Sequence, residues 1–210
     1  MTLNGKVVPE KVAYLKFGIS GMVRVIKVAV GDPVKKGQLV ASLDKTEAQT
    51  FLDKTLKLYD LQRAEFDEKQ KEKLTEYQKR RYQDELDITI KVVELAKADL
   101  DKTDLYASID GVVADISQVN QNENVTPAGF VIIVVDTNSY VFEAYAHDIE
   151  ITKFQIGQKV ALNFTPFPDR NFFGTVKYIG LVPDKEGYRV IAEIQDKAGL
   201  LLGFSGKISF

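Results

Sequence analysis

The hydrophobic and polar positions divide the chain into two β-rich parts on either side of a long polar stretch. Residues 45–104 contain neither glycine nor proline and are rich in Glu, Lys, Gln, Leu and Ala, a composition typical of helix. On both sides of this stretch, apolar residues form short β-branched runs interrupted by glycines, a pattern typical of strands. The sequence therefore predicts a helical element inserted into β-structure.

Two signals near the middle of the polar stretch indicate that one helix ends there and a second begins. Three lysines gather where positive charge would stabilise a helix C-terminus: Lys69, Lys71 and Lys73. Thr75 follows, and Gln78 lies three residues later, which is the spacing of a capping box at a helix start. The chain is therefore expected to turn at Leu74–Thr75.

The predicted helices span residues 46–73 and 76–104 and run antiparallel. Asp44, with Glu47 three residues later, is the predicted N-cap of the first helix. Both helices show the alternating four- and three-residue spacing of a coiled coil. In the second helix the predicted seam consists of Tyr82, Leu86, Thr89, Val93, Ala96, Leu100 and Thr103. In the first helix it consists of Leu52, Leu56, Tyr59, Arg63 and Phe66.

The tip of this hairpin is the candidate contact site. The rest of the chain should not cover a hairpin of this length, so we expect it to project from the body. The residues at its end are Lys73, Leu74, Thr75, Glu76 and Tyr77. For any single residue, the simpler alternative is that this charged stretch is only the solvated face of a helix.

The β-rich segments on either side of the hairpin repeat each other. Three pairs of segments match at an offset that drifts only from 90 to 92: residues 20–23 with 110–113, 31–34 with 122–125, and 39–44 with 131–136. Asn122 replaces a turn glycine with a residue that tolerates left-handed φ. Each half is too small for a core of its own, so the two must pack together. The structural turn glycines of these halves are Gly21, Gly31, Gly37, Gly111 and Gly129.

After Asp136 the sequence becomes uniformly β-like, with bends at Gly and Pro. The predicted strands are Tyr140–Ala146, Lys159–Phe164, Phe172–Ile179, Arg189–Ile194 and Lys207–Phe210, and Asp148 opens a short turn of helix. Five strands must be closed or covered to hide their edges. Residues 1–17 are expected to supply the extra strand, which completes a small β-barrel.

The order of these motifs resembles the periplasmic adaptor proteins, also called membrane fusion proteins, of the HlyD-like group. Before the hairpin the resemblance rests on Gly21, Gly31, Asp32, Val34, Gly37, Gln38, Leu39, Leu43 and Asp44. After it, the matching residues are Leu95, Ala96, Lys97, Ala98, Leu100, Thr103, Asp110, Gly111, Val112, Val113, Val125 and Gly129. The barrel segment is similar through residues 148–150, 157–160 and 173–176. Where the family has Ala-Pro before its Asp-Gly, this chain has Ala107-Ser108-Ile109.

The resemblance implies a mainly β fold in three parts. A lipoyl-like (biotinyl/lipoyl) β-sandwich would comprise residues 18–44 and 105–136, interrupted by an antiparallel coiled-coil hairpin of residues 45–104. A small β-barrel would comprise residues 1–17 and 137–210. The implied function is that of an adaptor in a bacterial multicomponent efflux or secretion system, which links an inner-membrane transporter to an outer-membrane channel. Several copies would associate into a ring or funnel.

One motif of the family is not matched. Relatives that dock on an outer-membrane channel carry at the hairpin tip an Arg, a Leu four residues later and a Ser seven after that. With Thr75 at the Ser position, this chain has Glu68 for the Leu and Ala64 for the Arg. The resemblance therefore implies an inner-membrane transporter as a partner. Whether the hairpin tip also binds an outer-membrane channel is left as an open question by this mismatch.

Composition excludes several kinds of chemistry. The chain has no cysteine, and His147 is its single histidine, so a soft-metal site lacks ligands, and Met1 and Met22 cannot supply a methionine cluster. No phosphate-binding glycine loop, nucleophile elbow or paired-carboxylate arrangement is present. The net charge of -2 does not suggest a nucleic-acid surface. We expect a protein that is not an enzyme and has no cofactor or metal.

The sequence contains no run of eighteen apolar residues, and its first six residues do not resemble a secretion signal. The resemblance implies a periplasmic location, with anchoring to the inner membrane by a segment that this chain does not contain.

Two alternatives to the adaptor function remain. Lipoyl and biotinyl carrier domains share the same half-motifs and expose a modified lysine at the turn between them, and Lys45 falls near that place. Carriers join the halves by a tight turn, however, whereas about sixty helical residues intervene here, and a swinging arm requires a short exposed turn. The second alternative is a purely structural coiled-coil spacer, whose tip would contact no partner.

Overall fold

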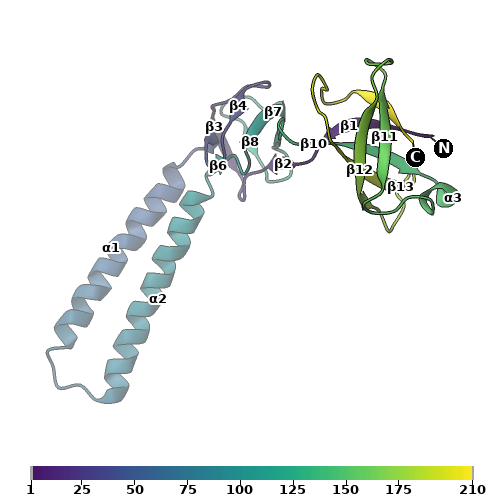
Figure 1. Ribbon diagram of the computed structural model, residues 1–210. Helices are drawn as coiled ribbons and strands as arrows, with labels where there is room; N and C mark the ends of the chain where they lie inside the picture. The colour runs from purple at the N-terminus through teal and green to yellow at the C-terminus, as the bar shows by residue number, and fades with distance from the viewer. Residues whose placement is uncertain (1, 210) are drawn as a thin grey trace. The chain divides into compact units, whose positions relative to one another are not determined.

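The computed structural model describes residues 2–209, in which β-strands flank a long helical hairpin and a closed β-barrel follows (Figure 1). The chain forms two compact units. One contains residues 14–109 and 113–133, and the other contains the residues up to 13, residues 110–112 and residues 134–210. Met1 and Phe210, which the predicted N-terminal segment and last strand include, lie outside the described residues.

The β-rich repeats form two four-stranded sheets within the described residues, with the orders β6-β5-β3-β8 and β2-β9-β7-β4. The strands of the first half are β3 (Gly21–Ile26), β4 (Pro33–Val34) and β5 (Leu39–Leu43). Their counterparts in the second half are β7 (Gly111–Ile116), β8 (Asn124–Val125) and β9 (Ile132–Val135). The outer strands are β2 (Val12–Leu15) and β6 (Asp104–Tyr106). Replacing each strand by its repeat converts one sheet order into the other, so the predicted repeat is present in the fold.

The two halves interlock because each gives its shortest strand to the other sheet: β4 joins β7, and β8 joins β3. The hydrogen bonds of this exchange are themselves repeated. Gly31 donates its N–H to the Val113 carbonyl at 2.8 Å, and Asn122 donates to the Val23 carbonyl at 2.8 Å. In return Val113 donates to Asp32 at 3.0 Å, and Val23 donates to Glu123 at 2.9 Å. Neither half can therefore complete its backbone hydrogen bonding alone.

The repeat conserves backbone conformation as well as pairing. Gly31 has φ of 95°, and Asn122 at the equivalent position has φ of 68°. The left-handed φ expected at Asn122 is thus observed, and it is the one non-glycine residue with positive φ among residues 2–209. The sheets enclose the apolar residues that the two halves share, which are Val23, Val34, Val40, Leu43, Val113, Val125, Ile132 and Val134, all at most 5% exposed.

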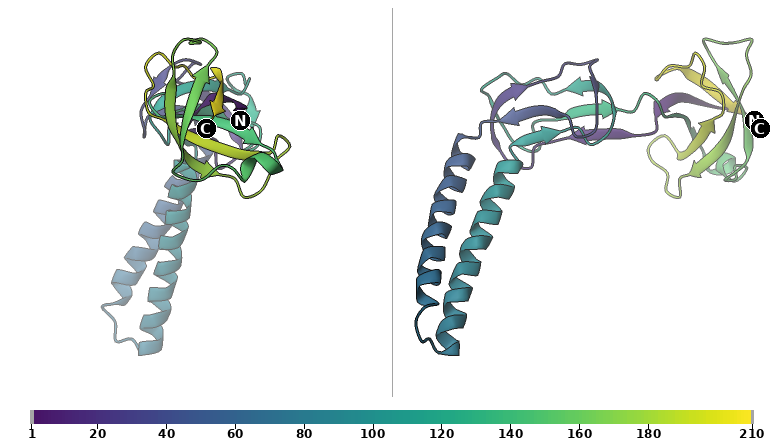
Figure 2. Two further views of the ribbon diagram at one scale, coloured as in Figure 1. Left: turned by 45° about the vertical axis from the view of Figure 1, so that its right-hand side comes forward. Right: turned by 60° about the vertical axis from the view of Figure 1, so that its left-hand side comes forward.

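The hairpin consists of α1 (Thr46–Lys69) and α2 (Glu76–Asp101), which lie side by side (Figures 1 and 2). At about 1.5 Å per residue, their 24 and 26 residues give lengths of nearly 40 Å. The predicted seam of the second helix is confirmed, because its six positions within α2 and Thr103 just after it are all buried or half-buried. On α1 the prediction was wrong at two positions. Leu56 is 40% exposed and Arg63 is exposed, whereas the buried Thr55 and half-buried Gln62 occupy the seam.

The correction on α1 concerns the order of the three- and four-residue steps. The spacing from Leu52 through Thr55, Tyr59, Gln62 and Phe66 is three, four, three and four, which keeps the side chains on one stripe. The predicted set with Leu56 and Arg63 also alternates, in steps of four and three, so the spacing alone does not choose between the two sets. Thr55 is accommodated in the seam because its hydroxyl donates to the Leu52 carbonyl at 2.8 Å, so that burial leaves no unpaired polar group.

The ends of the helices also differ from the prediction. α1 ends at Lys69 instead of residue 73, and α2 ends at Asp101 instead of residue 104, because Asp104 already pairs in β6. The N-cap of α1 is Lys45, not Asp44. Asp44 still acts on this terminus, since its carboxylate accepts the N–H of Thr46 at 2.8 Å.

The second unit contains a closed barrel with the strand order β1-β10-β13-β12-β11-β14 within the described residues. Its strands are β1 (Thr2–Pro9), β10 (Tyr140–Ala146), β11 (Lys159–Phe164), β12 (Phe172–Ile179), β13 (Tyr188–Ile194) and β14 (Ser205–Ser209), and the short helix is α3 (Asp148–Ile151). The barrel encloses Phe142, Phe164 and Phe172, with ring centroids 5.6 and 5.0 Å apart along this row. The predicted strands are thus present, and β1 closes the barrel.

Residues 12–15, which the sequence analysis grouped with the barrel, are an exception. They form β2, which pairs with β9 in the second four-stranded sheet and not with a barrel strand. The extra barrel strand comes from residues 2–9 alone, and those residues pair with both β10 and β14.

Three glycine substitutions should distinguish the energetic cost of a steric clash from the cost of a left-handed backbone conformation. A Cβ on Gly111 would lie 2.2 Å from the Val135 carbonyl oxygen, so Gly111→Ala should cost about 2–4 kcal/mol. A Cβ on Gly31 meets nothing within 4 Å, so Gly31→Ala carries only the left-handed backbone penalty of about 1–2 kcal/mol, and Gly31→Asn should cost less. Urea unfolding measures all three variants.

The matched control is Gly18→Ala, which should be within about 0.5 kcal/mol of wild type. Gly18 lacks positive φ, and a Cβ there would make only ordinary contacts with Lys102 from 3.6 Å. Equal losses at Gly111 and Gly18 would contradict the close packing described for β7.

Candidate partner-docking site

The hairpin tip is a short loop between two helix ends. α1 ends as Gln70 and Lys71 donate to the carbonyls of Phe66 and Glu68, at 3.0 and 3.1 Å. The chain then reverses through Glu72, whose carbonyl accepts the N–H of Leu74 at 3.0 Å. These local hydrogen bonds build the loop from backbone contacts of residues close in sequence.

The start of α2 is held by the predicted capping box. The Thr75 hydroxyl accepts the N–H of Gln78 at 3.3 Å, and the Gln78 side chain accepts the N–H of Thr75 at 2.9 Å. The same hydroxyl lies 3.0 Å from Gln78 Oε1, to which it donates. Because both functions of the hydroxyl are used inside the chain, Thr75 sets the helix start rather than offering a free polar group.

The five tip residues predicted from sequence differ in exposure. Lys73, Thr75, Glu76 and Tyr77 are exposed, and Tyr77 is 77% exposed, unusually high for a large aromatic side chain. Leu74 is half-buried, and it lines a small cavity at the end of the seam with Phe66 and Tyr82. Leu74 therefore closes the seam, whereas Tyr77 and its charged neighbours face outward.

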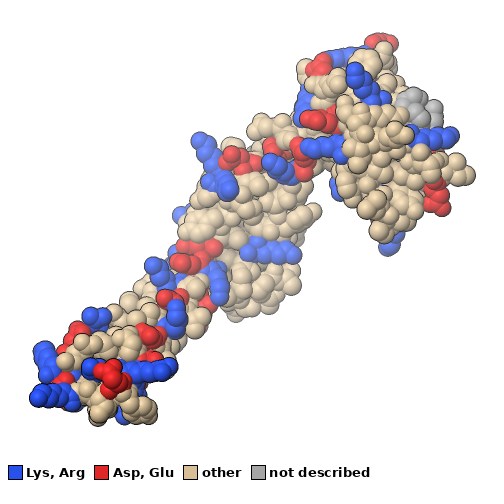
Figure 3. Space-filling view, turned by 60° about the horizontal axis from the view of Figure 1, so that its bottom comes forward, with Lys and Arg blue, Asp and Glu red and all other residues tan. Residues whose placement is uncertain are grey.

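The tip carries a local excess of positive charge. Residues 69–80 contain five Lys or Arg and two Glu, a net charge of +3 in a chain whose net charge is -2. Two of these cations are paired locally, Lys69 with Glu72 at 3.0 Å and Lys79 with Glu76 at 2.8 Å. Figure 3 shows blue and red side chains interleaved over the end of the hairpin. The end of the hairpin therefore combines a net positive charge with the exposed Tyr77 ring.

The root of the hairpin is tied together by Asp104, which the sequence analysis did not single out. Its carboxylate, 13% exposed, accepts from Lys45 Nζ at 2.6 Å and from the Ser42 hydroxyl at 2.5 Å. Burial raises the pKa of Asp104, but the hydrogen bonds from Lys45 and Ser42 and the Lys45 charge together lower it below 3.8. No local spacing signals this cluster, because only the pairing of β5 with β6 brings residues 42 and 104 together.

This contact also defines the environment of Lys45, the candidate carrier lysine. Its ammonium group is bound to Asp104 at the start of a 24-residue helix. The geometry is that of a structural ion pair between the two stems of the hairpin.

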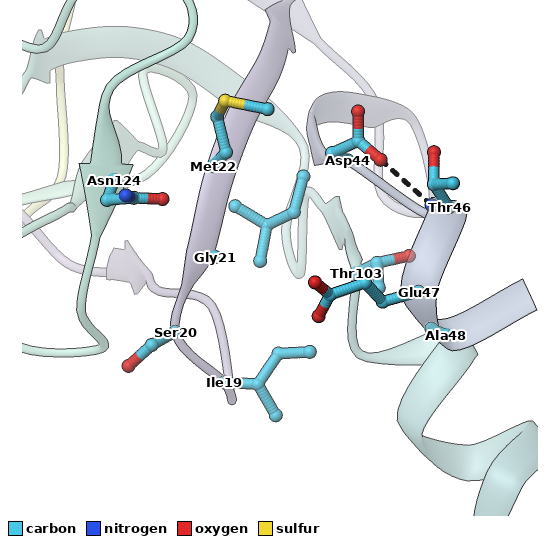
Figure 4. Close-up of a pocket in the computed structure, with 11 residues that line it drawn as sticks. Ile19, Ser20, Gly21, Met22, Asp44, Thr46, Glu47, Ala48, Thr103 and Asn124 are labelled. Atoms are coloured by element: carbon cyan, nitrogen blue, oxygen red, sulfur yellow. Dashed lines mark hydrogen bonds between the residues drawn. The ribbon is translucent and has the colours of Figure 1, made fainter. Parts of the chain in front are cut away.

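A pocket of about 620 Å³ opens beside the root of α1 (Figure 4). Met22 and Leu43 belong to its apolar part, and Asp44 and Glu47 contribute carboxylates. The hydrogen bonds from Thr46 hold the pKa of the Asp44 carboxyl below its ordinary value. No histidine or lysine lines the pocket.

The five predicted turn glycines lie within or beside the two sheets but serve different roles. Gly31 and Gly37 have φ of 95° and 83°. Gly21 and Gly111 begin β3 and β7, where a Cβ would meet Leu43 at 3.0 Å and Val135 at 2.2 Å. Gly129 lies in a turn in which its N–H is donated to the Thr126 carbonyl at 2.9 Å. None of the five lies at the hairpin tip.

Other candidate chemistry is sparse. No group of three or more His, Asp or Glu side chains among residues 2–209 is placed to hold a metal ion. His147 is the N-cap of α3, and its backbone N–H donates to the Glu150 carboxylate at 3.0 Å. Over the same residues, the hairpin and the short helix include no segment that is both long and apolar enough to span a bilayer.

Comparison of this fold with solved structures identifies its class. The chain matches the membrane fusion protein Spr0693 from Streptococcus pneumoniae R6 with a TM-score of 0.82 and 20% identity, over 100% of this chain and 98% of that one. It matches a chimera of MacA and MexA that contains the Pseudomonas aeruginosa MexA α-hairpin domain with a TM-score of 0.87 and 18% identity, over 99% and 79%. A putative efflux transporter from Bacteroides eggerthii matches with a TM-score of 0.70 and 18% identity, over 99% and 67%.

The chain therefore has the fold of the membrane fusion, or periplasmic adaptor, proteins, and the resemblance seen in its sequence motifs is confirmed at the level of fold. No protein-family model matches the chain, and no curated protein matches it by sequence.

Removing the tip cap should loosen the start of α2. Thr75→Ala deletes the acceptor for the Gln78 N–H and should destabilise this terminus by about 1 kcal/mol. We expect faster hydrogen exchange at the first amides of α2, with little change at Leu86. Thr50→Ala is the control, because Thr50 is an exposed threonine inside α1, where alanine favours helix. Unchanged exchange in Thr75→Ala would contradict the capping role.

Acid should weaken the root of the hairpin. Because the pKa of Asp104 is lower in the folded protein than in the unfolded chain, its contribution is full above about pH 4–5 and is lost as pH falls through the folded-state pKa. At pH 7, Asp104→Asn should reduce the free energy of unfolding by about 1–3 kcal/mol. The difference from wild type should shrink below about pH 4 in urea titrations followed by circular dichroism.

Asp99→Asn provides the matched control, since Asp99 forms an exposed pair with Lys102 at 2.8 Å. It should change stability by no more than about 0.5 kcal/mol at either pH. A pH-independent difference between Asp104→Asn and wild type would show that the Asp104 carboxylate charge is not what stabilises the root.

Proposed function

We propose that this protein is the adaptor, or membrane fusion, subunit of a bacterial multicomponent efflux or secretion system. In this function it links an inner-membrane transporter to an outer-membrane channel and catalyses no reaction. The observation that carries the proposal is the match of the whole chain, hairpin included, to Spr0693 with a TM-score of 0.82. The location that follows is the periplasm, with anchoring at the inner membrane.

The parts of the chain would divide this work. The two interlocked four-stranded sheets correspond to a lipoyl-like sandwich of residues 18–44 and 105–136, and residues 45–104 to the coiled-coil hairpin. Residues 1–17 and 137–210 correspond to the barrel, with β2 as the exception already described. Copies would associate through the sandwich and barrel surfaces into a ring or funnel. The sandwich would serve as the platform from which each hairpin reaches its partner.

The distal contact is assigned to the hairpin tip, residues 73–77. Three features support this choice: the 77% exposure of Tyr77, the local charge of +3, and a loop conformation set by hydrogen bonds within the chain. A preorganised loop loses little conformational entropy on binding, and an exposed tyrosine is a frequent anchor in interfaces. The partner surface should then be acidic around an apolar pocket that accepts Tyr77.

The two alternatives are less well supported. A lipoyl or biotinyl carrier would need Lys45 free at a short turn, but its ammonium group is bound to Asp104 at 2.6 Å. A purely structural coiled-coil spacer does not require an exposed Tyr77 at a positively charged tip. The observation that distinguishes an adaptor from such a spacer is a partner bound at the tip.

Cross-linking in intact cells tests the tip. Because the chain has no cysteine, Tyr77→Cys in the full-length protein carries a unique thiol. A thiol-reactive cross-linker should yield an adduct with a second protein of the export system, identified by mass spectrometry. Asp60→Cys, an exposed position in the middle of α1, is the control and should not yield that adduct. Identical adducts from both positions, or self-adducts alone from Tyr77→Cys, would overturn the assignment of the tip.

A further inference from the structure

Three neighbouring strands of the barrel present a polar outer surface. β14, β11 and β12 lie side by side in that order, and β11 and β12 can be followed in Figure 1. Ile208, Leu162 and Phe172 are paired across these strands and are at most 1% exposed, so they form an inward row. Because successive residues of a strand point to opposite sides, the residues next to this row point out of the barrel.

The outward residues form a small grid. In one row, Ala161 on β11 pairs with Ser209 on β14 and with Phe173 on β12. In the next row, Asn163 on β11 pairs with Lys207 on β14. We call these five residues the amide face, after the side-chain amide of Asn163. The face therefore combines an aromatic ring, an amide and an ammonium group within three strands.

The Phe173 ring lies beside small side chains. It is 58% exposed, whereas its row neighbours Ala161 and Ser209 are half-buried. Phe173 and Asn163 are diagonal neighbours on adjacent strands, a separation of about 7–8 Å. A polar molecule the size of one sugar ring can therefore rest on Ala161, with the aromatic ring on one side and the amide on the other.

The amide face belongs to a part of the barrel with uncompensated positive charge. The strands β1, β14 and β11 contain no Asp or Glu, and their lysines are Lys6, Lys207 and Lys159. None of the ion pairs within residues 2–209 includes these three lysines. Across β1, Lys6 lies opposite Glu143, but that carboxylate already binds Arg189. The charge therefore favours an anionic ligand.

Shape and composition make this face unlike a typical protein interface. A closed barrel of six strands turns by about 60° per strand, so β11 and its two neighbours form a convex ridge. Serine, alanine and lysine, which are three of the five residues of the amide face, are depleted in contacts between proteins. A convex polar ridge suits an extended hydroxylated polymer, which is held through one or two of its units at a time.

The three functional groups of the amide face match the chemistry of an acidic amino-sugar polymer. A pyranose ring has a face of C–H bonds, which packs on the electron-rich face of an aromatic ring such as that of Phe173. The side-chain amide of Asn163 both donates and accepts hydrogen bonds, as an acetamido group requires. The ammonium group of Lys207 can form a charge-assisted hydrogen bond to a carboxylate.

We propose that the amide face binds a glycan strand of acetamido sugars that carries carboxylates, which is the chemistry of peptidoglycan. The choice of this ligand rests on the periplasmic location in the proposed function, because peptidoglycan lies in that compartment. Each contact is weak, but several copies on one polymer would bind with avidity. The sandwich and the strands β10 and β13, on the other side of the barrel, stay available for contacts between copies.

Co-sedimentation of the full chain with peptidoglycan sacculi, freed of protein and of phosphate-bearing polymers, tests the proposal. We expect binding to sacculi, weaker binding to chitin, which has acetamido groups but no carboxylates, and none to cellulose, which has neither. Binding to sacculi should fall about threefold when salt is raised to ~1 M, because the charge of Lys207 is then screened. Equal binding to cellulose, or no depletion of the protein by excess sacculi, would overturn the proposal.

Two variants locate the site. Phe173→Ala removes the stacking ring and Lys207→Glu reverses the charge, so each should lower the apparent affinity for sacculi by about tenfold. The matched controls are Phe51→Ala and Lys57→Glu, which should leave binding unchanged. Phe51 is 49% exposed and Lys57 is exposed, and both lie on α1 of the hairpin.

Sedimentation velocity of the same variants separates this site from a contact between copies of the chain. Phe173→Ala and Lys207→Glu should keep the oligomeric state of wild type. A changed oligomeric state in either variant, or equal loss of sacculus binding in the hairpin controls, would overturn the assignment of the site. Because sacculus binding is measured with purified protein and the tip contact by cross-linking in cells, this proposal and the proposed function can fail separately.

Discussion

The exchange of β4 and β8 between the two halves is the constraint on which the rest of this unit depends. Gly31 and Asn122 donate to the carbonyls of Val113 and Val23, so each half completes a sheet that belongs mostly to the other. The hairpin is inserted between these halves and inherits its position from them. The chain leaves at the end of β5 and returns in β6, which pairs with β5, so both stems of the hairpin start from one edge of a sheet. Asp104 reinforces this root by binding Ser42 and Lys45.

The hairpin itself is held by a seam in which polar residues are tolerated because they are internally satisfied. Thr55, Thr89 and Thr103 each donate a hydroxyl hydrogen bond to a carbonyl three residues earlier. Towards the tip the seam ends with Phe66, Tyr82 and Leu74, and the capping box of Thr75 starts the return helix. A largely local network of this kind allows the loop to keep its conformation while Tyr77 is exposed.

Much of this architecture can be predicted from sequence because it is encoded locally. The repeat, the capping box at Thr75, the left-handed Asn122 and the barrel strands all follow from spacing or residue type. The seam of α1 was misassigned at Leu56 and Arg63 because two sets of residues there alternate by three and four residues, and the spacing alone does not show which of them faces α2. The root cluster could not be predicted, since Ser42 and Asp104 are distant in sequence and only the β5–β6 pairing joins them. Likewise, β2 pairs with β9 at the edge of a four-stranded sheet. Which sheet accepts an edge strand depends on the tertiary fold, so no local sequence pattern predicts this pairing.

The function that we propose for this protein is to connect other proteins. The most direct measurement is cross-linking of the affinity-tagged full-length protein in intact cells, followed by purification and mass spectrometry of the linked residues. The adaptor function predicts links to an integral membrane transporter through the barrel or sandwich, and links to a different protein through residues 73–77. Purification with no membrane transporter, from cells in which the protein is folded and abundant, would contradict it.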